Sequence, residues 1–271
     1  MLFRSLDPEV RTRLHADAAA IGRAARYAGA GTVEFLYDPV AHDVYFLEVN
    51  ARLQVEHPVT EMVTGVDLVH AQLRLAAGTP MREALTLAGW TPVTPGHAPP
   101  LVAIEARICA EDPDAGWAPS AGRLGVVREP SGPWVRVDSA CEPGLEVGID
   151  YDSLLAKVVA WGPTRPVALA RLRRALDEHV VTGVATTLPL HRWIVRHPEF
   201  EAGEVSTSFL ADHWGGDTDH EVDPAVASAA IAVVRAAREN ALANRVPLPT
   251  GIGAEVTPWL VTARREAARA V

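Results

Sequence analysis

Two glutamates placed symmetrically about a turn are the first residues whose types and spacing could do chemistry. Strand-like runs span residues 32–37 and 44–49, and a turn-forming stretch lies around 39–43. If the hairpin folds about Ala41, Glu34 lies directly opposite Glu48 on one face. Two carboxylates at about 4 Å repel each other by on the order of 4 kcal/mol at an effective dielectric near 20. We therefore expect a proton, a basic neighbour or a cation to offset this repulsion.

Asn50 continues the same face and favours the cation. Two carboxylates and a carboxamide are hard oxygen ligands that suit Mg²⁺ or Mn²⁺, with phosphate oxygens completing the coordination shell. The alternation predicts that Glu34, Leu36, Phe46 and Glu48 share one face and that odd-numbered residues form an apolar face. A solvated outer face, where water screens both glutamates, has the same pattern, so these strands alone leave both interpretations open.

Polar side chains continue at every second position from Glu48 to Glu56, and they face one way if the segment stays extended. Arg52 offers a planar fork for a small oxyanion such as bicarbonate. Glu56, beside a guanidinium, is expected to be ionised and available as a general base. His57 precedes Pro58, and we expect it to be structural rather than a ligand.

Helices and strands around these residues must position them. Helical spacing predicts a first helix from Pro8, with Asp7 as its N-cap, and further helices over 66–77 and 81–88. A proline-rich stretch over 91–100 predicts a domain boundary. Beyond it, strand-like runs at 101–110, 123–128, 134–138 and 154–161 indicate an antiparallel sheet, followed by helices from Thr164 and over 188–195. An Ala-rich tail follows, with helices near 224–242 and 258–270. The pattern is that of an α+β protein.

Composition excludes several classes of protein. The chain has 271 residues, 48% of them hydrophobic, which excludes a disordered protein. A net charge of −9 predicts no affinity for nucleic acid or anionic membranes. The apolar runs are too short to span a bilayer. Two cysteines, with no recognisable signal peptide, predict a cytoplasmic protein.

Two long motifs resemble the biotin carboxylase component of biotin-dependent carboxylases. They read Gly-Ala-Gly-Thr-Val-Glu-Phe-Leu at 29–36 and Phe-Leu-Glu-Val-Asn-Ala-Arg-Leu-Gln-Val-Glu-His-Pro-Val-Thr-Glu at 46–61, and the likeness covers about residues 15–212. The resemblance implies the C-terminal part of an ATP-grasp domain over 1–90 and a biotin carboxylase C-terminal antiparallel-sheet domain over 101–213. Residues 214–271 would form a helical extension.

The resemblance also implies a role for each matching residue. Glu34, Glu48 and Asn50 would bind the metal of MgATP, and Leu36 and Leu47 would lie beside the adenine. Bicarbonate would be held by Arg52, Gln54, the Val55 backbone and Arg107. Glu56 would deprotonate it, and Arg107 would stabilise the biotin enolate. The implied reaction uses ATP to convert bicarbonate into carboxyphosphate and then carboxylates biotin. Without the resemblance, an ion pair with Glu105 is the ordinary explanation of Arg107.

The resemblance further implies the partners of a ligase that serves an acetyl-CoA or propionyl-CoA carboxylase. These are biotin on a separate carrier protein or domain, a carboxyltransferase subunit, and a second copy of the chain in a homodimer. The family's glycine-rich lid and phosphate-gripping lysines have no counterpart here, and the single lysine, Lys157, belongs to a different motif. We therefore expect the isolated chain to be inactive. The alternative is a catalytically silent dimerisation or scaffold fragment of the same family.

Overall fold

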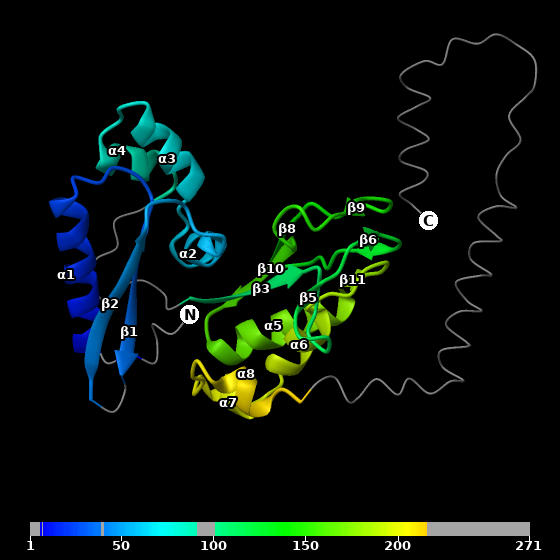
Figure 1. Cartoon of the computed structure of the whole chain (residues 1–271). Helices are drawn as coiled ribbons and strands as arrows, with labels where there is room; N and C mark the ends of the chain where they lie inside the picture. The colour runs from blue at the N-terminus through cyan, green and yellow to red at the C-terminus, as the bar shows by residue number, and fades with distance from the viewer. Residues whose placement is uncertain (1–5, 7, 39–40, 91–100, 216–271) are drawn as a thin grey trace, which may run out of the picture. The chain divides into compact units, whose positions relative to one another are not determined.

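A computed structural model describes residues 6, 8–38, 41–90 and 101–215, and every element below lies in these ranges (Figure 1). The Asp7 cap, the proline-rich boundary at 91–100 and the two predicted tail helices lie outside the described residues. Within the described residues, no helix is long and apolar enough to cross a membrane.

The N-terminal part consists of a helix followed by a hairpin. Helix α1 (Pro8–Ala24) begins at the predicted proline and buries Leu14. Strands β1 (Thr32–Asp38) and β2 (Asp43–Asn50) pair antiparallel as a two-stranded sheet. Gly31 precedes β1, and a Cβ atom there would lie 3.2 Å from the backbone oxygen of Asn50. This glycine therefore lets the start of β1 lie close to the end of β2.

The hairpin register contains a bulge that the sequence did not predict. Glu34 pairs with Glu48 as predicted, but the register shifts next to this pair, so that Phe35 pairs with Phe46 and Leu47 has no partner. The rings of Phe35 and Phe46 contact edge to face, with centroids 6.2 Å apart. The prediction that Phe46 shares the face of Glu34 is therefore wrong, because the extra residue of a bulge reverses the alternation beyond it.

Three short helices follow the hairpin. Helix α2 (His57–Thr64) was not predicted; it carries Pro58 in its first turn and ends at Gly65, which has a φ of 76°. Helices α3 (Leu68–Ala76) and α4 (Met81–Leu87) confirm the predicted pair. The Asp67 side chain caps α3 by accepting the His70 N–H at 2.7 Å, so α3 begins later than the apolar periodicity suggested.

The predicted antiparallel sheet consists of β3 (Val102–Cys109), β10 (Leu154–Gly162) and β8 (Val135–Ser139), in the order β3-β10-β8. One face is apolar and packs on helix α5 (Arg165–Glu178), which begins after Thr164 as predicted. Ile104, Ile108 and Val158 are at most 2% exposed on this face. The opposite face of the same strands carries charged side chains.

Shorter elements complete the C-terminal part. Three strand pairs are β4 (Glu111–Asp112) with β5 (Ala118–Pro119), β6 (Gly122–Arg123) with β9 (Glu146–Val147), and β7 (Val127–Arg128) with β11 (Val180–Val181). Helices α6 (Leu188–Ile194), α7 (Pro198–Ala202) and α8 (Phe209–His213) follow. The single strand predicted over 123–128 is wrong: Gly125 interrupts it and donates its N–H to Thr182 at 2.8 Å.

Candidate functional site

The side chains of Glu34, Glu48 and Asn50 meet on one face of the hairpin. Asn50 Nδ2 donates to Glu34 Oε1 at 2.7 Å and to Glu48 Oε1 at 3.0 Å. Because both oxygens contact one nitrogen atom, their separation is less than the sum of these distances. The predicted approach of the two carboxylates on a shared face is confirmed, and the amide donates to both negative groups.

Gln54 and Arg52 extend this cluster along the chain. Gln54 Nε2 donates to Glu34 Oε1 at 3.2 Å, and Arg52 Nη1 donates to Gln54 Oε1 at 3.1 Å. The guanidinium also donates to the Leu53 carbonyl at 3.2 Å. Five polar side chains, those of Glu34, Glu48, Asn50, Arg52 and Gln54, therefore form one hydrogen-bonded network.

The segment after Asn50 turns instead of staying extended. Strand β2 ends at Asn50, and Glu56 is the N-cap residue of α2 with φ −83° and ψ 12°. The condition under which all five side chains would face one way, an extended segment from Glu48 to Glu56, is therefore not met. The turn brings Gln54 back to Glu34, and His57 Nδ1 lies 2.7 Å from the Gln54 carbonyl, which is a structural role.

Glu56 meets a residue from the C-terminal sheet. Its carboxylate Oε2 lies 4.0 Å from Arg107 Nη1 on β3, and both side chains are about half exposed. Glu56 is the ion-pair partner of Arg107 among the described residues, so the ordinary pairing with Glu105 does not occur. Because both side chains are about half exposed, a small planar anion can reach the carboxylate and the guanidinium from solvent.

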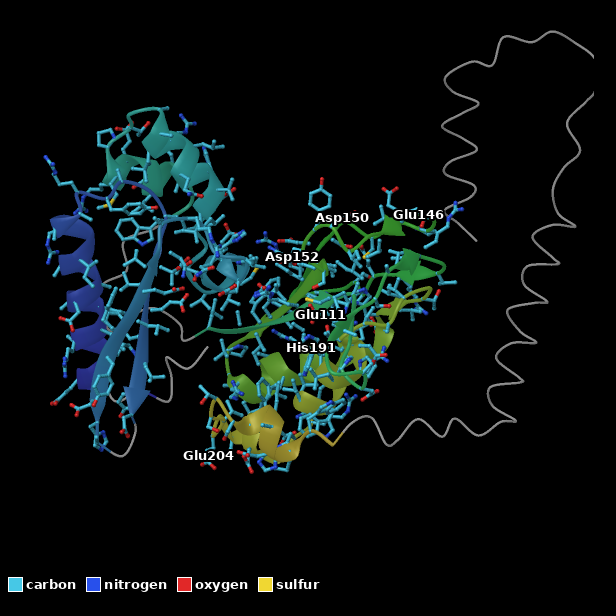
Figure 2. All side chains as sticks on the ribbon, in the orientation of Figure 1. Glu111, Glu146, Asp150, Asp152, His191 and Glu204 are labelled. Atoms are coloured by element: carbon cyan, nitrogen blue, oxygen red, sulfur yellow. The ribbon has the colours of Figure 1, made fainter. Side chains whose placement is uncertain are left out.

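Two side chains hold the backbone carbonyl of Arg107: one from Thr187, just before α6, and one from His191 on α6. The carbonyl accepts from Thr187 Oγ1 at 3.1 Å and lies 2.7 Å from His191 Nε2 (His191 is labelled in Figure 2). Burial lowers the pKa of His191, which favours the neutral ring, and the accepting carbonyl requires the proton on Nε2. These contacts position the strand that carries the Arg107 guanidinium.

The acid beside this pair, Glu105, has a buried carboxylate that the sequence did not predict. Glu105 precedes Arg107 by two residues on the same face of β3, and its carboxylate oxygens are buried without a hydrogen-bond partner among the described residues. Burial raises the pKa of Glu105 to about 7; Lys157 opposes this rise and Glu56 adds to it. The sequence placed Glu105 near Arg107 as a possible ion-pair partner, but the burial of its carboxylate depends on tertiary packing.

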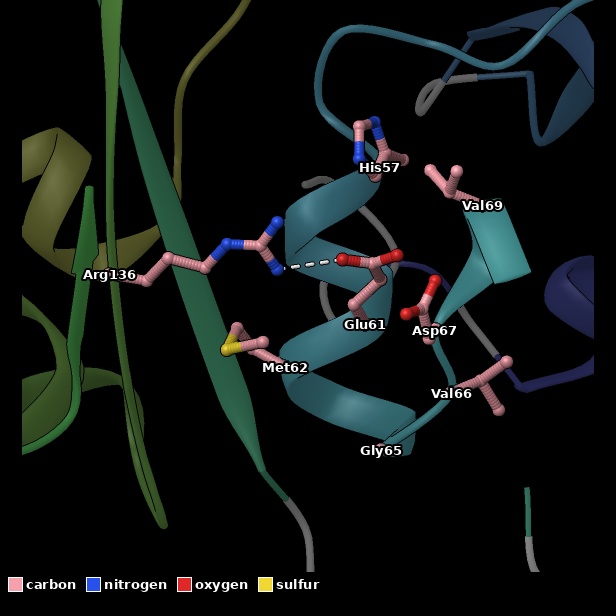
Figure 3. Close-up of a pocket in the computed structure, with 8 residues that line it drawn as sticks. All are labelled: His57, Glu61, Met62, Gly65, Val66, Asp67, Val69 and Arg136. Atoms are coloured by element: carbon pink, nitrogen blue, oxygen red, sulfur yellow. Dashed lines mark hydrogen bonds and ion pairs between the residues drawn. The ribbon is translucent and has the colours of Figure 1, made fainter. Parts of the chain in front are cut away.

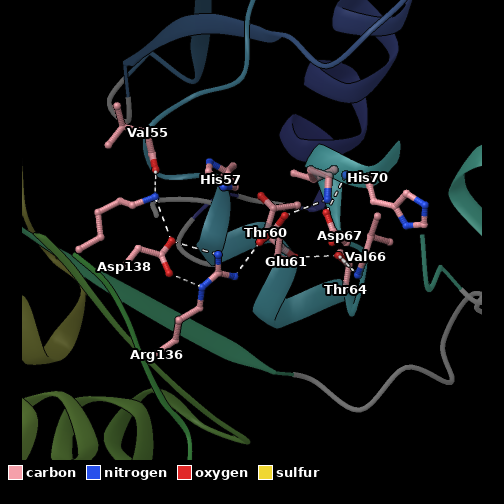
Figure 4. A network of polar contacts seen from close by, with 12 residues as sticks. Val55, His57, Thr60, Glu61, Thr64, Val66, Asp67, His70, Arg136 and Asp138 are labelled. Carbon is pink, nitrogen blue, oxygen red and sulfur yellow. Dashed lines mark hydrogen bonds and ion pairs between the residues drawn. The ribbon is translucent and has the colours of Figure 1, made fainter. Parts of the chain in front are cut away.

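A second polar network joins α2 to the sheet (Figure 4). Glu61 is 7% exposed and accepts from Arg136 Nη1 at 2.7 Å and from the Leu68 N–H at 2.8 Å. A pocket of about 370 Å³ lies beside this contact (Figure 3) and is lined by His57, Glu61, Met62, Gly65, Val66, Asp67, Val69 and Arg136. None of the candidate catalytic or metal-site residues lines it.

The donor set of the hairpin fits a hard divalent cation. The Glu34 and Glu48 carboxylates offer hard oxygen atoms of the kind that Mg²⁺ or Mn²⁺ prefers. Asn50 presents its Nδ2 to both carboxylates, so the amide would have to turn for its Oδ1 to join them as a ligand. No group of three His, Cys, Asp or Glu side chains is arranged for a metal in the described part of the chain.

Two family models match successive parts of the chain. Residues 105–212 match the biotin carboxylase C-terminal domain, and residues 4–84 match the ATP-binding domain of the carbamoyl-phosphate synthase L chain. Biotin carboxylase 1 of Bacillus subtilis is 44% identical over 209 residues, which is 76% of this chain and 44% of that protein. The mouse mitochondrial propionyl-CoA carboxylase alpha chain is 43% identical over 212 residues, covering 76% of this chain and 28% of that one.

Solved structures agree with these relatives. The biotin carboxylase domain of a thermophilic 2-oxoglutarate carboxylase bound to bicarbonate matches with a TM-score of 0.68 and 39% identity, over 77% of this chain and 45% of that chain. A dimer of the Hydrogenobacter thermophilus domain, with MgADP, ADP and bicarbonate, matches equally, at a TM-score of 0.68 and 39% identity, over 77% of this chain and 44% of that chain.

The fold is therefore that of an ATP-grasp-related ligase whose last part is an antiparallel-sheet domain. More narrowly, the chain is similar to biotin carboxylases and biotin carboxylase domains over 76–77% of its length, so the resemblance and the fold class expected from its motifs are confirmed. The chain spans less than half the length of the relatives it matches, at 44% of the Bacillus subtilis protein.

Proposed function

We propose that this chain supplies the metal-binding and bicarbonate-activating part of a biotin carboxylase that serves an acyl-CoA carboxylase. The observation that carries the proposal is the meeting of Glu56 with Arg107, from sequence segments far apart, at the end of the network of carboxylates and amides. An acid and a guanidinium at this spacing suit an anion that must be both held and deprotonated.

The hairpin residues serve the nucleotide. Glu34, Glu48 and Asn50 hold the divalent cation of ATP, whose charge, when bound, offsets that of the phosphates. Leu36 and Leu47 are 55% and 61% exposed and lie free to contact the adenine.

The segment after the hairpin serves bicarbonate. Arg52, Gln54, the Val55 backbone and Arg107 bind the anion, and Glu56 removes its proton. The freed oxygen attacks the γ-phosphorus of ATP, ADP leaves, and carboxyphosphate forms. Phosphate then leaves carboxyphosphate and accepts the proton of a ureido nitrogen of biotin, Arg107 stabilises the negative charge on the resulting biotin enolate, and that nitrogen takes up the carboxyl group.

The rest of the assembly is part of the same proposal. Biotin arrives on a separate carrier protein or domain, a carboxyltransferase subunit uses the carboxylated biotin, and the chain forms a homodimer. A cytoplasmic location accords with Cys109 and Cys141, which are both free thiols in the structure.

Fixation of labelled bicarbonate into biotin tests the proposal. The chain is joined to the part of the Bacillus subtilis relative that it does not cover, and ATP, Mg²⁺ and free biotin are added. We expect ATP-dependent formation of labelled carboxybiotin. A folded, nucleotide-binding fusion that fixes no bicarbonate would favour the silent scaffold instead.

A further inference from the structure

The charged face of the C-terminal sheet has no role in the reaction as proposed, apart from Arg107. This face carries Glu105 and Arg107 on β3, Lys157 on β10, and Arg136 and Asp138 on β8. Lys157 occupies the middle of the face, because it pairs with Arg107 on one side and with Asp138 on the other.

Lys157 joins this face to the segment proposed to bind bicarbonate. Its ammonium donates to the Val55 carbonyl at 3.2 Å and lies 3.2 Å from Asp138 Oδ2. The side chain is 13% exposed, so water competes little for these contacts. Val55 and Lys157 are 102 residues apart in the chain.

The carboxylate that holds Lys157 is itself fixed. Asp138 accepts from Arg136 Nε at 2.7 Å and from Arg136 Nη2 at 3.0 Å, a two-point contact that sets the orientation of both groups. The third contact of Arg136 is Glu61 on α2, at 2.7 Å. The sheet therefore holds α2 at Glu61 and, through Lys157, at Val55 just before the helix begins.

This second attachment determines where Glu56 lies. Glu56 directly follows Val55 and is the N-cap of α2, and its carboxylate reaches Arg107 on the strand adjacent to Lys157. A shift of the Val55 carbonyl away from β10 moves both the Val55 N–H and the Glu56 carboxylate away from Arg107.

We propose that Lys157 is a positioning residue that holds the Val55–Glu56 backbone against the sheet, so that Glu56 and Arg107 face the same anion. The proposal rests on the proposed function for the identity of that anion, whereas the attachment itself rests on the contacts of Lys157. The ammonium acts through Val55 and Glu56 and does not touch the reacting atoms.

Hydrogen–deuterium exchange in the 271-residue chain tests the attachment. Lys157→Met should make the amides of His57 and Val59, which bond to Gln54 and Glu56, exchange about tenfold faster, while amides of β3 and α5 keep their protection. Arg123→Met is the matched control, because it removes an exposed cation paired with Glu146 at 3.7 Å. Unchanged exchange at His57 and Val59 in a folded Lys157→Met variant would overturn the proposal.

The single lysine permits a direct measurement on the unmodified chain. Lysine-selective ¹⁵N labelling yields one side-chain ammonium group, and we expect its N–H protons to exchange slowly enough to be observed at neutral pH. An ammonium that exchanges as fast as free lysine would contradict the proposal even if the Met variant does not fold.

Kinetics of the fusion separate positioning from a general structural role. Lys157→Met should raise the KM for bicarbonate about tenfold and leave the KM for ATP unchanged, and Lys157→Arg should restore most of the loss. Equal losses for both substrates would count against Lys157 as a positioning residue. If the unmodified fusion has no bicarbonate-dependent activity, the proposed function fails, and the exchange measurements still decide the attachment.

Discussion

Near the candidate site, the protein environment shifts the pKa of Glu105 strongly. Its pKa rises to about 7 from an ordinary value of 4.5, chiefly because the carboxylate is buried. The folded chain therefore binds this proton more tightly than the unfolded chain does. Stability from this group is fully present below about pH 4.5 and is lost as pH rises towards 7.

Glu105→Gln should remove the loss of stability that accompanies the rise in pH, because the amide stays neutral at every pH. We expect the variant to gain stability relative to the unmodified chain as pH rises from 5 to 8, in urea unfolding followed by circular dichroism. Glu146→Gln is the control, since that side chain is 73% exposed. Parallel pH profiles for the unmodified chain and Glu105→Gln would show that Glu105 ionises normally.

Arg52 and Arg107 should differ in the steps that they affect. In the fusion, Arg52→Ala should raise the KM for bicarbonate, because it removes an anchor present in both ground and transition states. Arg107→Ala should reduce biotin carboxylation more than bicarbonate-dependent ATP cleavage, because its charge also serves the biotin enolate. Identical losses in every partial reaction would instead indicate one structural network.

At the level of elements, helix α5 supports the sheet from its apolar face. Leu172 on α5 is 1% exposed, so Leu172→Ala should reduce the free energy of unfolding by about 2–5 kcal/mol. Leu73→Ala is the matched control, since Leu73 is 66% exposed on α3 and should cost less than about 0.5 kcal/mol. If Leu172→Ala and Leu73→Ala reduced the free energy of unfolding equally in chemical denaturation, the burial of α5 against the sheet would be contradicted.

Part of the hairpin pairing was predictable from the sequence. The alternation of Val33 to Val49 about a turn was enough to predict the pairing of Glu34 with Glu48. It could not locate the bulge, because Phe46 and Leu47 are both apolar and either residue can be the extra one. Helix α2 was missed because Pro58 suits a turn as well as a first helical turn.

The site was predictable where its residues lie within the recognised motifs. Residues 29–36 and 46–56 carried the metal assignment and, with Arg107, the bicarbonate assignment through the family resemblance, and those roles stay proposals. The contacts of Lys157 with Val55 and Asp138 were not predictable, because they join strands and a loop that meet only in the folded chain. Burial of Glu105 depends on the same packing.

At the level of the whole chain, the hairpin exposes an apolar surface. Five side chains are 43–61% exposed there: Leu36, Tyr45, Phe46, Leu47 and Val49. Clustered apolar residues on an unpaired strand edge favour association. We expect concentration-dependent self-association in analytical ultracentrifugation, and the double substitution Tyr45→Ser with Phe46→Ser should weaken it. Tyr151→Ser, at a residue 91% exposed, is the control; a strictly monomeric chain would contradict this expectation.

The isolated chain should not carboxylate biotin. It spans 44% of the Bacillus subtilis relative, and phosphoryl transfer requires groups that surround the phosphates on all sides. Robust bicarbonate-dependent ATP cleavage by this polypeptide alone would refute this prediction.

The most direct test of the central claim is the rate of bicarbonate-dependent ATP cleavage by the fusion, with and without Glu56→Gln. The amide keeps the shape of Glu56 but cannot accept a proton. We predict that bicarbonate stimulates cleavage and that Glu56→Gln lowers kcat by about 10²–10⁴-fold while ATP still binds. A fusion whose bicarbonate-stimulated rate survives Glu56→Gln would show that this residue is not the base and would contradict the account.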